Sequence, residues 1–587
     1  MAEKIVSPGV YTRESDQSQI TEGPIVVEAA IVGPTTKGPV EEPTIVTSYS
    51  DFTSKFGGAL ESASQRFTFL NNIAANNFFQ QGGESLLVVR AVSGSYTTAK
   101  TLTAGGAGAN NVIKSGSADN LGPFSLATVS KGTINNSESP VLNNVLTSGS
   151  KDNIRWEVTE KNDKNGTFNL LIRRGNDTGK DKVILEQYLN LSLDPFSPNY
   201  IEQVIGNQTT TVRKDENSDF YTQITGSYPN KSRYVVVNAV TSPTPNYLDA
   251  AGVVGGTLPG AYSASLPVVA SGSFGGGTGN IGASNFYGDI ASGLTGTQGI
   301  GPNDYTQSIS LLKNKDLYNY NILAIPGVIS GLSATHNEVI DTTIAAAEDS
   351  GDSLVVFDSV AFGTTDASDL VTEAEKFNTS FAATYWPWLQ TEDPELGQRV
   401  FVPASVMMPG VYAFNDKSKD PWFAPAGLNR GALPNVIRAE KALTKAERDT
   451  LYNGKVNPIA TFAGSGVVVF GQKTLQKQAS ALDRVNVRRL LIALKRFIGG
   501  VGTNLVFEQN TTSTRNNFLA QVNPYLESVQ QRQGLFAFKV VMDDTNNTPD
   551  VVDRNQLVGQ VFIQPAKTAE FIILDFNILP TGVEFPS

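Results

Sequence analysis

The sequence predicts a multidomain protein that combines an α/β core with β-rich material. Its 587 residues suffice for roughly three to five domains of ordinary size. Between residues 318 and 402, strand patterns alternate with helix patterns in the order βαβαβ, which is typical of a mostly parallel sheet covered by helices. From 96 to 299 the chain is rich in Gly, Ser, Thr and Asn and has little helical periodicity. We therefore expect a β-rich domain inserted into an α/β core.

Residues 1–22 are expected to be an arm that belongs to no domain. A Ser-Pro-Gly turn at 7–9 precedes a short strand at 10–12, and the residues that follow are polar without an apolar face. The core then begins with residues 23–95, which contain two apolar strands. Between these strands, residues 64–81 have apolar side chains at helical spacing and end at two glycines, which predicts a helix.

The second part of the core is predicted at 300–440. Helices are expected over 334–349 and 366–379, each between two apolar strands. Between the two parts of the core, the inserted residues 96–299 contain one clear hairpin at 154–173, whose turn reads NDKNG.

The last unit is predicted at 441–587. A helix is expected around 481–498, followed by a strand NLVFE, a helix over about 513–533, and three strands at 535–543, 556–564 and 569–579. From about residue 566 this unit should continue as a C-terminal arm. In the last strand, apolar residues alternate with Asp575 and Asn577.

The composition removes most catalytic and metal chemistry. Cysteine is absent and His336 is the sole histidine, so thiolate nucleophiles and sites with two histidine ligands are excluded. No dinucleotide, phosphate-loop or GxSxG motif occurs in a fitting context. We expect no catalytic residue, no cofactor and no metal. An α/β hydrolase would depend on the acids Asp358, Asp366 and Asp369, of which Asp366 and Asp369 suit the start of a helix better.

Charge and hydropathy also limit the partners. A net charge of −11 argues against nucleic acid, and no apolar run is long enough to span a membrane. The amino terminus has no signal-peptide pattern, so we expect assembly in a cytoplasm. One helix is strongly basic on the face opposite an apolar stripe, which fits either a solvated helix or docking onto an acidic protein. The basic residues are Arg484, Arg488, Arg489, Lys495 and Arg496.

The two chain ends are both strands without a local partner. Unpaired strand edges can pair with a neighbouring chain, so self-assembly by exchanged strands is predicted. The residues expected to take part are Val6, Val10, Tyr11 and Thr12 at one end, and Ile572, Leu574, Phe576, Ile578 and Val583 at the other.

Several segments resemble the tail sheath proteins of contractile bacteriophages, in the same order along the chain. The resemblance covers roughly residues 1–95 and 310–587. It rests on SPGVYTRE (7–14), AAIVGPTTKGPVEEPTIVTSYSDFTSKFG (29–57), PWFAPAGLNRGAL (421–433), NPIATFAGSGVVVFGQKTL (457–475), DRVNVRRLLIALKRFI (483–498), LVFEQNT (505–511) and GQVFIQPAKTAEFIILDF (559–576).

This resemblance implies a subunit that polymerises helically around a tail tube and contracts to drive genome ejection. It implies that both arms add strands to a neighbour's C-terminal domain and that the inserted domain faces outward. We further predict that the C-terminal domain faces the tube, through the basic helix 483–498 or its neighbour 513–533. The resemblance also implies contacts with tube, baseplate and tail terminator proteins, and a place in the virion. The alternatives are a sheath of a non-phage injection machine, an α/β hydrolase, and a passive shell or adhesin protein.

Overall fold

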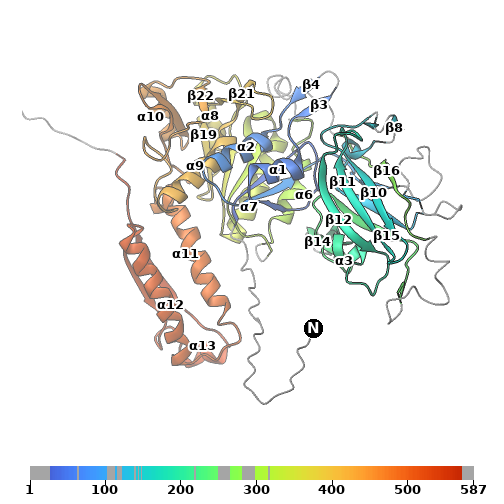
Figure 1. Cartoon of the computed structure of the whole chain (residues 1–587). Helices are drawn as coiled ribbons and strands as arrows, with labels where there is room; N and C mark the ends of the chain where they lie inside the picture. The colour runs from blue at the N-terminus through green and yellow to red at the C-terminus, as the bar shows by residue number, and fades with distance from the viewer. Residues whose placement is uncertain are drawn as a thin grey trace, which may run out of the picture.

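The structure consists of an α/β domain flanked by a β-rich body and by a helical C-terminal unit (Figure 1). It confirms a multidomain protein of mixed α/β structure with several separate sheets. The computed structural model describes residues 27–62, 65–101, 113–114, 122–137, 141–142, 145–146, 148–216, 220–248, 265–280, 298–314 and 317–570.

An eight-stranded sheet forms the centre of the α/β domain. Its order is β2-β5-β1-β17-β18-β19-β23-β24, in which the six inner strands are parallel and the two edge strands are antiparallel to their neighbours. The bounds are β1 Val27–Gly33, β2 Thr44–Val46, β5 Leu86–Arg90, β17 Tyr320–Ile329, β18 Leu354–Asp358, β19 Ala382–Trp386, β23 Asn457–Phe462 and β24 Gly466–Val469.

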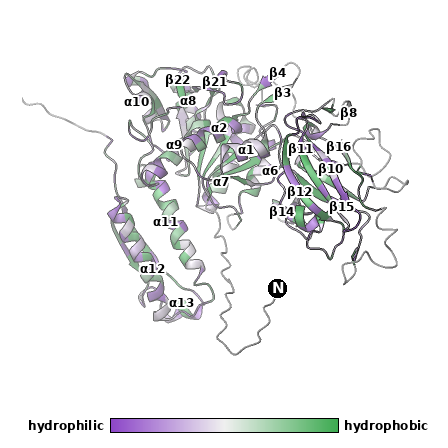
Figure 2. Ribbon diagram, in the orientation of Figure 1, coloured by the Kyte–Doolittle hydropathy of each residue, from purple (hydrophilic) through white to green (hydrophobic). Residues whose placement is uncertain are grey.

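The inner strands are apolar along most of their length because both faces of the sheet are covered. Every residue of β5, β18 and β19 is buried, as expected for parallel strands under helices. Figure 2 shows the same region as hydrophobic. The covering helices are α1 Tyr49–Phe56, α2 Leu70–Gln80, α6 Asp304–Leu311, α7 Ala334–Ser350, α8 Ala367–Ala374, α9 Ala404–Ser418 and α10 Lys445–Asn453.

The predicted helix over 64–81 is wrong at its start. Strands β3 (Leu60–Ser62) and β4 (Gln65–Phe67) pair antiparallel in this region, and α2 begins only at Leu70. The side chain of Gln298 accepts a hydrogen bond from the backbone N–H of Leu70 at 2.9 Å and thereby satisfies a free donor of the first turn. A residue 228 positions later therefore helps to set where this helix begins.

The boundary predicted at 441 for the C-terminal unit is also too early. Strands β23 and β24 extend the eight-stranded sheet beyond β19, so the chain leaves the core only after them. Between β19 and β23 the chain forms a short separate sheet of β20 (Leu389–Glu392), β21 (Arg399–Val402) and β22 (Val436–Ala439). Sequence spacing alone gave no sign that so late a strand returns to the core sheet.

The inserted region folds into sheets around its own hydrophobic core, which includes Trp156, Phe124 and Phe168. The hairpin predicted at 154–173 is confirmed as β10 and β11. One sheet has the order β12-β11-β10-β16, a second β15-β7-β6, and β13 pairs with β14. The bounds are β6 Thr98–Lys100, β7 Phe124–Lys131, β10 Ile154–Asn162, β11 Thr167–Arg174, β12 Ile184–Ser192, β13 Thr209–Lys214, β14 Phe220–Thr225, β15 Val235–Val240 and β16 Ala270–Ser273.

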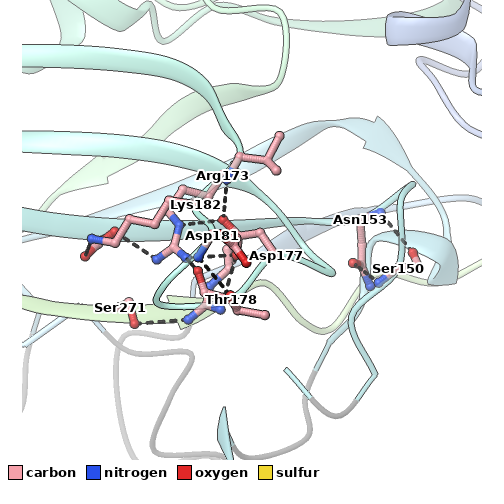
Figure 3. Close-up of polar contacts among 11 residues, drawn as sticks. Ser150, Asn153, Arg173, Asp177, Thr178, Asp181, Lys182 and Ser271 are labelled. Carbon is pink, nitrogen blue, oxygen red and sulfur yellow. Dashed lines mark hydrogen bonds and ion pairs between the residues drawn. The ribbon is translucent and has the colours of Figure 1, made fainter. Parts of the chain in front are cut away.

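A buried ionic network holds the turn after β11 against its sheet (Figure 3). Arg173 donates to both carboxylate oxygens of Asp177, at 2.7 and 2.9 Å, and to Glu157 at 2.8 Å. Lys182 also donates to Glu157 at 2.8 Å. The side chains of Arg173 and Asp177 are only 2% and 0% exposed, so each charge depends on the other for its stabilisation.

The C-terminal unit consists of two long helices and a hairpin. Helices α11 (Val485–Thr503) and α12 (Thr512–Gln531) pack together, and β25 (Leu535–Val541) pairs with β26 (Gln560–Pro565) beside α12. The short helix α13 (Pro549–Asp553) lies between the two strands in the chain. Their shared core includes Leu490, Leu494, Phe518, Val522 and Leu526.

The predicted strand NLVFE is wrong. Helix α11 continues through Gly499 and Gly500 to Thr503, and turns follow it. Val501 is buried in the shared core of this unit, so packing against α12 holds the last turn of α11 despite its glycines.

None of the helices in the described part of the chain has the length and apolar character needed to span a membrane.

Candidate functional site

The positive charges of α11 mainly bind the protein's own core. Arg488 is 4% exposed, lies 3.9 Å from the ring centre of Phe381 and donates to Ser380. Arg489 is 3% exposed and pairs with Asp416 through two hydrogen bonds, at 2.8 and 2.5 Å. The prediction that these two arginines form part of a surface patch is wrong, because the fold buries both against the α/β domain.

Two further cations of the predicted patch are also engaged. Arg484 forms a two-point contact with Glu570, at 2.7 and 3.0 Å, and a 2.8 Å ion pair with Asp483. Arg496 donates to the backbone carbonyl of Tyr320 at 2.9 Å. Lys495 is exposed. The contacts of Arg484, Arg488, Arg489 and Arg496 thus join the C-terminal unit to the core. Of the predicted basic residues, Lys495 remains available for contact with another protein.

The hairpin β25–β26 is a sheet with two uncovered edges. Among the described residues no third strand pairs with either member. Its inner face packs on α12, whereas Phe536 and Phe562 remain 78% and 56% exposed. An isolated two-stranded hairpin is marginal in water, and its open edges are ready to accept strands.

The core sheet, in contrast, has protected edges. The outer side of β24 is hydrogen bonded by the segment 427–433: Gly427 donates to Val469, Val469 to Gly431, and Leu433 to Val467. At the other edge β2 is only three residues long. Within the described residues, the edges of the main sheet are therefore covered or short, whereas those of the C-terminal hairpin have no partner strand.

A cavity of about 640 Å³ lies where the chain leaves the hairpin. It is lined by aromatic residues, including Trp422, Tyr452 and Phe470, and by residues 566–570. Glu570 is half-buried here and receives hydrogen bonds from three different side chains. Sequence reasoning did not identify Glu570, although its position as a lone acid ahead of an apolar strand pattern was a usable signal.

The residues predicted for strand exchange lie outside the described residues. This holds for Val6, Val10, Tyr11 and Thr12 of the N-terminal arm, and for Ile572, Leu574, Phe576, Ile578 and Val583 of the C-terminal arm. The predicted strand at 569–579 is described only as far as Glu570. Their participation in strand exchange stays a prediction.

The histidine and carboxylates weighed for catalysis have structural roles. His336 is 1% exposed, and its Nδ1 accepts the backbone N–H of Ile329 at 3.1 Å. Asp366 caps α8, as predicted, by accepting the N–H of Ser368 at 3.0 Å. The described residues contain no group of three acids or histidines that is able to hold a metal ion.

Asp358 is the one buried acid among these candidates. It ends β18 and accepts the N–H of Ser405 at 3.0 Å and its hydroxyl at 2.5 Å, at the first turn of α9. Burial raises the pKa of Asp358 to about 7, although both hydrogen bonds lower it. Asp366 and Asp369 are exposed, so the three carboxylates do not share an enclosed site.

Comparison with known proteins agrees with the C-terminal half of this architecture. Residues 298–475 match the central domain of the phage tail sheath protein family, and 477–579 match its C-terminal domain. Tail sheath proteins of Vibrio phage KVP40 and Enterobacteria phage T4 are 41% and 39% identical over 185 residues, or 32% of this chain. The matched region spans 28% of the length of each of these relatives.

The fold as a whole is similar to a solved sheath protein. A sheath tail protein from Listeria innocua has a TM-score of 0.50 at 11% identity, covering 92% of this chain and 95% of its own. The matched boundary between the two family domains, near residue 476, agrees with the point where the chain leaves the core sheet after β24. Residues 298–475 and 477–579 are therefore similar to the central and C-terminal domains of phage tail sheath proteins, and the fold is similar to that of a sheath protein.

Proposed function

We propose that this protein is the structural subunit of a contractile tail sheath. It polymerises helically around a tail tube and contracts to drive that tube through the host envelope for genome ejection. The observation that carries the proposal is the C-terminal hairpin, whose edges have no partner strand among the residues that the structure describes, although the edges of the main sheet are covered or short. This function requires no catalytic group, cofactor or metal, in keeping with the structural roles of His336 and Asp358.

Neighbouring subunits are joined by exchanged strands. The N-terminal arm of one copy and the C-terminal arm of another pair with β25 and β26 of a third. Added strands satisfy the open backbone groups and cover Phe536 and Phe562. A hairpin enlarged to four strands is a stable sheet, whereas two strands alone are marginal.

Contraction is a rearrangement of rigid bodies linked by these arms. The α/β domain, the inserted domain and the C-terminal unit each have a separate hydrophobic core, which supports movement of whole subunits rather than unfolding. The extended sheath is a kinetically trapped state, so its lifetime is governed by a barrier.

The C-terminal unit faces the tail tube. The charges assigned to this contact must exclude Arg488 and Arg489, which are buried, and include Lys495. The connection between α11 and α12 adds an apolar element, because Val506 is 59% exposed and Phe507 is fully exposed. An exposed aromatic residue beside α11 suits contact with another protein.

The remaining partners follow from this assembly. The sheath contacts the baseplate and the tail terminator at its two ends, is assembled in the host cytoplasm, and forms part of the virion. The inserted domain faces outward. A sheath of a non-phage injection machine uses the same mechanics, but the relatives from Vibrio phage KVP40 and Enterobacteria phage T4 are phage proteins.

Electron microscopy of the purified protein tests the proposal. The full-length chain is expected to form hollow helical tubes, and deletion of residues 1–15 or 580–587 is expected to leave folded, soluble protein that forms none. Lys164→Ala, in an exposed turn of the inserted domain, is the control and should form normal tubes. Normal tubes from both truncated proteins would refute strand exchange. The proposed function would be refuted if the full-length chain formed no helical tubes, either alone or when mixed with purified tail tubes.

A further inference from the structure

Glu570, near the start of the predicted C-terminal arm, is held by three side chains from the body of the protein. Glu570 accepts two hydrogen bonds from the guanidinium of Arg484, at 2.7 and 3.0 Å, one from Gln472 at 3.0 Å and one from the hydroxyl of Tyr452 at 2.8 Å. Gln472 also donates to Thr568 at 2.7 Å. Charge-assisted and paired hydrogen bonds of this kind are the strongest that side chains form.

The donors come from elements that are themselves fixed. Tyr452 belongs to α10, Gln472 follows β24, and Arg484 precedes α11. Lys473 lies 4.0 Å from the ring centre of Tyr452 and donates to its backbone carbonyl at 2.7 Å, which holds the ring in place. The carboxylate thus ties the arm to the joint between the core and the C-terminal unit rather than to the hairpin from which it emerges.

The charges around Glu570 favour its ionised form. Burial raises its pKa, but the hydrogen bonds from Arg484, Gln472 and Tyr452 lower it more, so the net pKa is below its ordinary value of 4.5. Charged groups near the contact include Lys455, Lys473 and Asp483, and Asp483 pairs with Arg484. Lys445, Arg448, Asp449 and Lys567 line the same cavity. The contact is therefore weakened only when the pH falls through the lowered pKa of Glu570.

We propose that Glu570 is the fixed root of the C-terminal arm, held by Arg484, Gln472 and Tyr452 so that the arm starts from the same point on every subunit. This inference rests on the proposed function, because a fixed root matters only if the arm is lent to a neighbour. The benefit is entropic: a fixed root shortens the length of chain that must be positioned when the strand binds, and so raises the effective concentration of the strand at the neighbour's hairpin.

Trypsin cleavage after Lys567 reports on the contact without any need for assembly. Lys567 is exposed, but Thr568 and Glu570 are both held, so the peptide bond becomes a substrate only when the contact opens. On the unassembled fraction of the full-length chain, Glu570→Ala should release the segment 568–587 about tenfold faster or more, with smaller increases for Glu570→Gln and Tyr452→Phe. Mass spectrometry of the released segment measures the rate.

Two controls separate this effect from general loosening. Glu527→Gln removes an exposed carboxylate of α12 and should cleave at the wild-type rate, and cleavage after Lys180 in the inserted domain should be equal in every variant. Release of 568–587 at equal rates in wild type and Glu570→Ala would overturn the proposal.

Assembly then tests the role of the fixed root. Tubes of Glu570→Ala should be fewer and shorter than those of wild type at the same concentration, while Glu527→Gln forms normal tubes. Faster cleavage together with normal tubes would also overturn the proposal, because the contact would then exist without guiding the arm. If the wild-type chain forms no tubes, the proposed function fails, whereas the cleavage result still stands as a test of the contact.

Discussion

Arg489 shows how the fold buries a charge whose spacing along the helix is typical of an exposed face. Its side chain is 2% exposed and pairs with Asp416, whose side chain is 21% exposed. The ring centre of Tyr412 lies 4.8 Å from the guanidinium. Such a pair adds little net stability compared with an apolar contact, but removal of one partner leaves an uncompensated buried charge.

We therefore expect Asp416→Ala to lower the free energy of unfolding by about 3 kcal/mol, because Arg489 loses the carboxylate that neutralises it. Asp550→Ala breaks the exposed pair with Arg554 and should change stability by about 0.5 kcal/mol or less. Urea denaturation followed by fluorescence measures both. Equal effects of the two substitutions would contradict the importance of the buried pair for the joint.

Asp358 predicts a specific dependence of stability on pH. Its pKa is about 7 in the folded protein and about 3.8 when unfolded, so between these values the native state binds more protons. The unfolding free energy that this residue contributes must therefore fall as pH rises from about 4 to 7. Between pH 5 and 8 the loss amounts to about 2–3 kcal/mol.

Comparison of the wild type with Asp358→Asn isolates this effect. The amide keeps the shape of the side chain but does not titrate, so the variant should gain stability relative to wild type as the pH rises from 5 to 8. Urea denaturation of both proteins at the two pH values measures the change. A stability difference that is independent of pH would contradict the raised pKa.

The C-terminal end of α11 has a low intrinsic helical stability because it contains two adjacent glycines. Gly499 and Gly500 lie inside the helix, and a Cβ atom built on either would meet nothing within 4 Å. Glycine in a helix interior costs roughly 0.5–1 kcal/mol relative to alanine. No packing around these two glycines within the described part of the subunit compensates for that cost.

Gly499→Ala and Gly500→Ala should each raise the stability of the C-terminal unit by about 0.5–1 kcal/mol. Gly534→Ala is the control with the opposite sign, since its Cβ would lie 2.6 Å from a methyl carbon of Val529. Hydrogen exchange of the α11 amides, compared among the three variants, measures the local effect. If Gly499→Ala and Gly500→Ala instead lower the stability, the surface around these glycines must be in contact with another part of the protein.

At the scale of the whole molecule, the inserted domain is a separable unit. It has its own hydrophobic core and enters between β5 and α6 of the α/β domain. A deletion of the inserted domain must retain Gln298. This fully buried side chain donates a hydrogen bond to the carbonyl of Pro326 at 3.2 Å and accepts one from the backbone N–H of Leu70. Arg90 loses its contact with Lys131 but keeps the one with Gly38.

Replacement of residues 96–295 by a Gly-Ser linker should thus leave a folded α/β domain that still forms tubes. A matched deletion that also removes Gln298 should be less stable by about 1–3 kcal/mol, because a buried N–H and carbonyl lose their partners. Circular dichroism, thermal melting and electron microscopy compare the two. Loss of the fold in the shorter deletion would show that the inserted domain supports the core.

The local pattern of the sequence determined much of this protein. Apolar runs of strand length, the alternation of strands with helices after residue 318, and the turn at 162–166 depend on short-range preferences and burial, and the corresponding elements are confirmed. Composition alone restricted the possible chemistry, because the chain has no cysteine and a single histidine.

Only the tertiary structure decided how distant segments meet. It brought Gln298 to the start of α2, Asp416 to Arg489, and the arm root at Glu570 to Tyr452. It also buried arginines that have the spacing of an exposed helical face. The physical reason is that periodicity records which side of an element is apolar, whereas the partners of a buried polar group are set by the packing of elements far apart in the chain.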